Sequence, residues 1–190
     1  MKAAVTLALA AVLVAGVTVA RAAELKSGLQ PGATVPAFDV EKCAGAVNDG
    51  RSVGDNFCYR CMLGNKPVVM VWSRKADDSL AKLVKELDKA CEKNADQKLS
   101  SFVNLLGKDA DALKTQAKQF GAKNKVENVA IVVPQDHENG PADYQINPEA
   151  EVTVLIYRGG KVEANHAVAP GQLNDKTISS IVGDTSKILK

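Results

Sequence analysis

Apolar runs alternate with amphipathic segments through the middle of the chain. Segments 67–72 and 129–133 are continuously apolar and rich in β-branched residues, and 99–106 is a further strand candidate. Continuous apolar runs of this length are typical of strands buried on both faces of a sheet. The pattern therefore predicts three central strands within one domain.

The segments between these strands carry apolar residues at helical spacing. A helix is predicted over 78–93, with one apolar stripe formed by Leu80, Leu83, Val84, Leu87 and Cys91. Asp77 or Asp78 is its expected N-cap. A second helix is predicted over 109–120, with Gly121 as its C-terminal stop. Alternating strands and helices predict an α/β fold with a mostly parallel sheet covered on both faces.

The flanking segments complete the order of elements. Residues 35–40 form a short edge-strand candidate, and 45–66 read as a long loop because turn residues recur there. Strand 151–157 is joined through two glycines to a partner that ends near residue 168, which predicts a C-terminal hairpin. A last helix is predicted over 174–189.

The beginning of the chain has the pattern of an export signal. Lys2 precedes a mostly apolar run over 3–20, and Ala20-Arg21-Ala22 is a small-x-small cleavage site. This pattern predicts a cleaved signal peptide over 1–22 and a protein that is periplasmic or secreted. An irregular segment, 23–34, and one domain, 35–190, are expected to follow. The alternative is a membrane anchor, since the run approaches the length that spans a bilayer.

Charge excludes one class of function. Removing residues 1–22 takes away two of the 24 basic residues, Lys2 and Arg21, and none of the 22 acidic ones, so 22 of each sign remain. A neutral chain lacks the basic footprint of a nucleic-acid-binding protein. We therefore expect no nucleic-acid partner, and no membrane partner after signal cleavage.

Four cysteines are the candidate chemistry: Cys43, Cys58, Cys61 and Cys91. In an oxidising compartment an even number of cysteines can form disulfides. Strand 67–72 advances about 20 Å and the following helix returns about 20 Å. Cys91 is therefore expected at the level of Cys58 and Cys61, and Cys43 is a further possible disulfide partner.

Three interpretations of the cysteines stay open. They can be structural cross-links, which stabilise a domain by roughly 2 to 4 kcal/mol. Alternatively, Cys58 and Cys61 form a reducible C-x-x-C pair, in which Arg60 would favour a thiolate. A metal site for copper or zinc would need further ligands, for which His137 and His166 are the only histidines. No cofactor-binding motif is present in the sequence.

Three motifs resemble the redoxin and peroxiredoxin members of the thioredoxin-like superfamily. Residues 31–38 are similar to the opening of these proteins, 67–72 to the strand before their active site, and 151–162 to their late hairpin. The resemblance covers about 28–189 and implies a thioredoxin-like domain: a mixed, mostly parallel sheet with helices on both faces, a C-terminal hairpin and a last helix.

The usual catalytic positions of that superfamily are absent here. The segment after the central strand, 73–79, contains no cysteine, and Val152 stands where the resemblance places a cis-proline. The resemblance therefore implies a divergent member, at most a thiol–disulfide oxidoreductase. Cys58 and Cys61 are its tentative catalytic residues, and protein thiols or disulfides its partners. The alternatives are a non-catalytic, disulfide-stapled binding domain and a periplasmic protein that handles copper or zinc.

Overall fold

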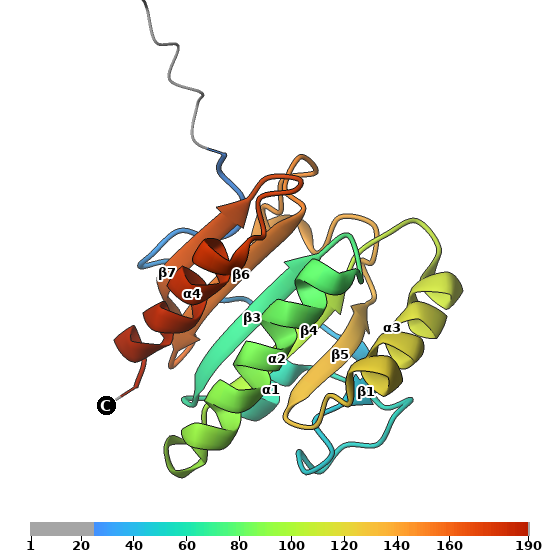
Figure 1. Ribbon diagram of the computed structural model, residues 1–190, viewed down its shortest axis with the longest axis horizontal. Coiled ribbons are helices and arrows are strands. Elements are labelled where there is room, and N and C mark those ends of the chain that lie inside the picture. The colour runs from blue at the N-terminus through green and yellow to red at the C-terminus, as the bar shows by residue number, and fades with distance from the viewer. Residues whose placement is uncertain (1–24, 190) are drawn as a thin grey trace, which may run out of the picture.

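The computed structural model describes residues 25–189 (Figure 1). The signal peptide predicted over 1–22 lies outside these residues. None of the helices within 25–189 combines the length and the apolar character that crossing a membrane would require.

Seven strands and four α-helices make up the described chain. The strands are β1 (Val40–Gly45), β2 (Asn56–Phe57), β3 (Pro67–Ser73), β4 (Ser100–Leu105), β5 (Val129–Pro134), β6 (Val152–Arg158) and β7 (Lys161–Val168). The helices are α1 (Tyr59–Leu63), α2 (Asp78–Lys93), α3 (Ala110–Asn124) and α4 (Asp175–Gly183). Short 3-10 turns occur at Ala95–Gln97, Ala142–Tyr144 and Asp184–Lys187. The predicted α/β fold is confirmed.

The strands form one mixed sheet in the order β2-β1-β5-β4-β3-β6-β7. The central pairs β3–β4 and β4–β5 are parallel, as crossover helices require. The outer pairs are antiparallel, including the predicted hairpin of β6 and β7. All of β3 is buried, in agreement with its continuous apolar sequence.

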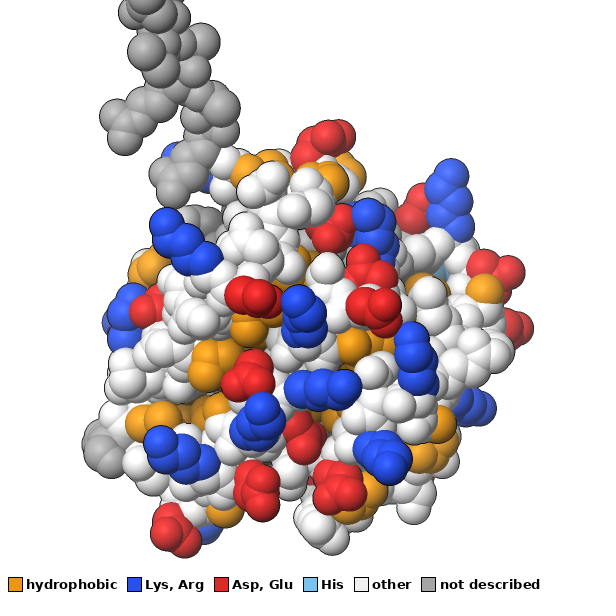
Figure 2. All heavy atoms as spheres, viewed as in Figure 1, with side chains coloured by type: hydrophobic (Ala, Val, Ile, Leu, Met, Phe, Trp, Pro, Cys, Tyr) orange, Lys and Arg blue, Asp and Glu red, His pale blue; other side chains and the backbone are white. Residues whose placement is uncertain are grey.

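The two faces of the sheet are covered in different ways. One face packs against α2, α3 and α4 through one apolar cluster. The other packs against α1 and irregular segments that contribute Leu29, Phe38 and Tyr144. Figures 1 and 2 view the three-helix face, on which acidic and basic side chains are interspersed over the helices. This mixture fits the solvated faces of amphipathic helices.

The first helix of the βαβ unit begins and ends as expected. The carboxylate of Asp77 accepts hydrogen bonds from the backbone N–H groups of Ser79 and Leu80, both at 3.0 Å. An aspartate in this position satisfies donors that the helix itself leaves unpaired. Asp77 is therefore the N-cap of α2.

The predicted edge strand over 35–40 was wrong, because the first strand begins only at Val40. Val35 and Phe38 are buried, but the backbone of this segment bonds elsewhere. The Val35 N–H donates to the carbonyl of Gly160, and the Pro36 carbonyl accepts from the Tyr144 hydroxyl. Residues 35–39 are thus an extended cover for the sheet, attached to β7 only beside the isolated bridge between Thr34 and Lys161.

Gly121 does not stop the second helix, contrary to the prediction. α3 continues to Asn124 and ends at Lys125, which has a left-handed φ of 51°. A Cβ on Gly121 would lie 2.4 Å from the Cβ of Ala44 in β1. The glycine therefore permits close packing of α3 on β1.

Candidate functional site

Cys58 and Cys61 form a disulfide at the beginning of α1. Cys58 is the N-cap of this helix, and its sulfur accepts a hydrogen bond from the Cys61 N–H at 3.0 Å. The side chain of Cys58 is half-buried and that of Cys61 is exposed. The pair is therefore within reach of solvent and of thiols in solution.

The pair lies between the short edge strand β2 and the buried strand β3. β2 ends at Phe57, so Cys58 follows it directly, and α1 is only five residues long. α1 covers the face of the sheet opposite α2, α3 and α4, where Tyr59 and Leu63 enter the core. The redox-capable sulfurs thus sit where the chain leads into the central strand.

The two remaining cysteines are free thiols, and both are buried. Cys43 lies in β1, 2% exposed, in the cluster beneath α3. Cys91 lies near the end of α2 and lines a cavity of about 300 Å³ together with Met62 and Leu63 of α1. The end of α2 therefore does return to the level of α1. The structure joins neither free cysteine to Cys58 or Cys61.

Burial makes both free thiols poor nucleophiles. The pKa is raised to about 11 for Cys43 and to about 12 for Cys91, mainly by burial and to a smaller extent by the negative charges of Glu41 and Asp88, respectively. Because the thiolate is the reactive form, roughly a thousandth or less of either thiol is ionised at pH 8. Any exchange chemistry near neutral pH is left to Cys58 and Cys61.

We expect reduced, folded protein treated with iodoacetamide at pH 8 to be modified at Cys58 and Cys61 well before Cys43 and Cys91. Mass spectrometry of the peptides at successive times measures the four rates. Raising the pH to 10 should speed both buried thiols, and Cys43 should react faster than Cys91 at either pH because its pKa is lower. Modification of either buried thiol as fast as the pair would contradict this assignment.

The two residues between the cysteines are each tied to another part of the domain. The Tyr59 hydroxyl donates a short hydrogen bond to the carboxylate of Asp49, and its ring stacks on Phe102 at 5.0 Å between centroids. Arg60 donates through Nε to the Val35 carbonyl at 3.1 Å. The structure thus shows Arg60 bound to the extended segment that contains Val35. Stabilisation of a thiolate by Arg60 stays a prediction.

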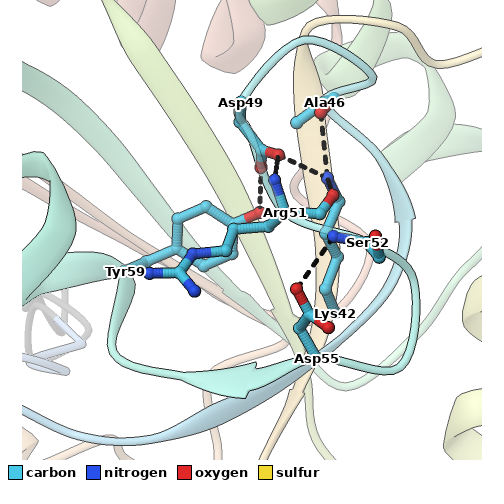
Figure 3. Close-up of polar contacts among 7 residues, drawn as sticks. All are labelled: Lys42, Ala46, Asp49, Arg51, Ser52, Asp55 and Tyr59. Atoms are coloured by element: carbon cyan, nitrogen blue, oxygen red, sulfur yellow. Dashed lines mark hydrogen bonds and ion pairs between the residues drawn. The ribbon is translucent and has the colours of Figure 1, made fainter.

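A buried lysine organises the loop that precedes the disulfide (Figure 3). Lys42 is 2% exposed, and its ammonium donates to Asp49 at 2.6 Å and to the carbonyls of Ala46 and Arg51 at 2.9 and 2.8 Å. Three partners satisfy its three donors, as burial of an ammonium requires. Sequence reasoning missed this group, although a lysine among apolar residues of a strand, followed by Asn-Asp-Gly, was a usable signal.

An ion pair occupies the region where the superfamily resemblance places catalysis. At the end of β3, Lys75 Nζ lies 2.6 Å from a carboxylate oxygen of Glu151, whose side chain is 6% exposed. The Arg74 guanidinium donates to the Glu138 carbonyl at 3.0 Å. No cis peptide bond occurs between residues 25 and 189, and Val152 begins β6. The region holds charged contacts in place of a thiol.

The two histidines lie apart from the cysteines. His137 Nδ1 is 2.8 Å from the Gly107 carbonyl, and His166 Nε2 is 3.0 Å from the Asp184 carboxylate. Within the described part of the chain, no three His, Cys, Asp or Glu side chains are grouped closely enough to hold a metal ion. The metal-handling alternative has no preformed site in this region.

No known sequence family and no curated protein matches the chain. Solved structures do match it, at low sequence identity. A candidate protein disulfide isomerase from Bacteroides thetaiotaomicron superposes with a TM-score of 0.63 at 14% identity, covering 87% of this chain and 94% of that one.

Two mycobacterial structures are similar in the same way. Peroxidoxin BcpB of Mycobacterium tuberculosis has a TM-score of 0.61 at 13% identity, covering 85% of this chain and 99% of that one. A secreted disulfide oxidoreductase of the same organism, homologous to Escherichia coli DsbE, has a TM-score of 0.54 at 14% identity, covering 77% and 95%. Similarity at these identities concerns the arrangement of helices and strands, not the chemistry.

Proposed function

We propose that this protein, which has the thioredoxin-like fold, is an exported thiol–disulfide exchange protein that acts through Cys58 and Cys61. The observation that carries the proposal is the accessible disulfide at the start of α1. A pair only three residues apart, with one of its two residues exposed, can exchange with another thiol without unfolding of the domain. The buried thiols of Cys43 and Cys91 offer no such access.

In the reducing direction, one thiolate of the pair attacks a sulfur of a substrate disulfide. A mixed disulfide forms and the first substrate thiolate leaves. The second cysteine of the pair then loses its proton and attacks the sulfur of the first. This step breaks the mixed disulfide, closes Cys58–Cys61 and releases the second substrate thiolate. Two electrons pass to the substrate, and the two protons of the pair go to solvent or to the product thiols.

The Cys58 sulfur is the better placed of the two to carry negative charge. It already accepts the Cys61 N–H at 3.0 Å, and an N–H donor stabilises a thiolate more than a thiol. Cys61, the more exposed residue of the pair, is the one that a substrate thiol reaches first when the pair is oxidised. These roles support exchange in both directions with protein thiols and disulfides as partners.

Export is part of the proposal. The apolar run and small-x-small site of 1–22 support it, and so does the likeness to a fold that includes a secreted disulfide oxidoreductase. Outside the reducing cytosol a solvent-accessible C-x-x-C pair persists in its oxidised form until a substrate reduces it.

We expect the midpoint potential of Cys58–Cys61 to lie above about −300 mV, in the range of exchangeable pairs. Graded glutathione buffers, alkylation and mass spectrometry of protein without residues 1–22 measure it. Cys58→Ser and Cys61→Ser should each abolish turnover of a disulfide substrate, whereas Cys91→Ser should leave turnover unchanged. A midpoint well below −300 mV would instead identify a structural cross-link in a binding domain.

A further inference from the structure

We propose that Lys42 and Asp49 act through Tyr59 to set the reduction potential of the Cys58–Cys61 pair. Tyr59 is thus a positioning residue for the pair, and so are the two charged residues behind it. The inference rests on the proposed function, because it assigns these residues a role in that same redox couple. We call the three residues the Lys42–Asp49–Tyr59 chain.

The first link is the buried ammonium of Lys42, which is held in place because displacing it from its acceptors would cost free energy. Lys42 belongs to β1, which is paired on both sides within the sheet. Its Nζ is enclosed by one carboxylate and two carbonyl oxygens, all within 2.9 Å. Moving this charge would leave the Asp49 carboxylate without its cation and take a donor from the Ala46 and Arg51 carbonyls.

The second link is Asp49, which joins Lys42 to Tyr59 in the disulfide segment, residues 58–61. One carboxylate oxygen of Asp49 accepts from Lys42 and from the backbone N–H of Arg51, at 2.6 and 2.9 Å. The other oxygen accepts from the Tyr59 hydroxyl. Burial, together with the hydrogen bond to Asp49, raises the pKa of Tyr59, so the hydroxyl remains protonated and continues to donate. In Figure 3 the carboxylate lies between the ammonium and the phenol.

The third link holds the peptide between the sulfurs from two directions. The Tyr59 ring is enclosed by Phe57 and Phe102, with centroids 4.5 and 5.0 Å away. Its neighbour Arg60 is tied to the Val35 carbonyl and lies so close to Gly160 that a Cβ there would be 2.0 Å from the guanidinium. The backbone between Cys58 and Cys61 is therefore anchored at both of its internal residues.

This anchoring affects the oxidised and reduced states unequally. On reduction the S–S bond breaks, and each sulfur takes up one electron and one proton from the thiol reductant. Two unbonded sulfurs repel at bonding distance, so the peptide between them must relax for the thiols to separate. A rigid peptide opposes that relaxation and keeps the thiols oriented for ring closure. The Lys42–Asp49–Tyr59 chain therefore favours the disulfide and lowers its potential.

The test compares Tyr59→Phe with Ser101→Ala in otherwise unchanged protein. Tyr59→Phe removes only the hydroxyl that contacts Asp49. We expect the equilibrium constant for reduction by a dithiol to increase about tenfold, which corresponds to a midpoint about 30 mV more positive for a two-electron couple. Asp49→Asn, a second and independent variant, should shift the midpoint in the same direction.

Ser101→Ala is the matched control, since it too removes only one buried hydroxyl. Ser101 is 4% exposed, and its hydroxyl donates at 3.0 Å to the Val69 carbonyl, between β4 and β3. The variant should lower stability to urea without moving the midpoint. An unchanged midpoint in Tyr59→Phe, or an equal shift in Ser101→Ala, would overturn the inference. Dithiothreitol buffers extend the range below −300 mV, so the shift is measurable even if the wild-type midpoint refutes the exchange function.

Discussion

Lys42→Met should lower the free energy of unfolding by about 3 kcal/mol or more. Methionine fills a similar volume but leaves the Asp49 carboxylate, whose side chain is 15% exposed, without its cation. Removing one partner of a buried pair costs about 3 to 5 kcal/mol, because the other charge stays uncompensated. We place the cost near the lower end because Asp49 keeps its bonds to Tyr59 and to the Arg51 N–H.

Urea unfolding of the oxidised protein, followed by circular dichroism, measures this loss as a shift of the midpoint. Lys89→Met is the matched control, since Lys89 is 70% exposed and pairs with Glu86 one helical turn away. An exposed pair contributes at most about 1 kcal/mol. The double variant Lys42→Met with Asp49→Asn should recover part of the loss. Equal effects of the two lysine variants would show that the Lys42 contacts contribute little.

Gly45→Ala should destabilise the domain by roughly 3 kcal/mol through two separate costs. Gly45 has a φ of +69°, which an L-residue adopts at a penalty of about 1 to 2 kcal/mol. In addition, a Cβ at this position would lie 2.0 Å from the carbonyl oxygen of Val129. That oxygen belongs to the backbone of the paired strand, so β1 and β5 would have to separate.

Gly50→Ala distinguishes these two costs. Gly50 also has a positive φ, 78°, but no atom lies within 4 Å of where its Cβ would be. It should therefore show only the conformational penalty, about 1 kcal/mol. Thermal unfolding of both variants in parallel gives the comparison. If Gly45→Ala were no worse than Gly50→Ala, the close approach to Val129 would be of no energetic consequence.

The fold was predictable wherever a local pattern decides the structure. β3 and α2 match their predicted positions because continuous burial and the 3.6-residue stripe are visible in the amino-acid order alone. The segment 35–40 could not be assigned in the same way. Its apolar residues suit an extended cover as well as a strand, and only the three-dimensional position of Gly160 decides where its backbone bonds.

The candidate site was predictable only in part. The spacing of Cys58 and Cys61 permitted their pairing, and the return of α2 placed Cys91 near them in level. No periodicity or residue spacing in the sequence reveals that Lys42 and Asp49 support the pair. Their contact depends on the length of the lysine side chain and on the geometry of the turns in the loop, which no local rule specifies.

The segment before β1 is attached to the last part of the chain. Ser27 Oγ lies 2.6 Å from the Thr153 hydroxyl, and Asn165 donates to the Ser27 and Leu29 carbonyls, both at 2.8 Å. These contacts bridge 126 to 138 residues. The first described residues therefore cannot reach their native partners before Thr153 and Asn165 have been synthesised. Such long-range closure is slow, so the α1 face of the sheet should be among the last parts of the domain to form.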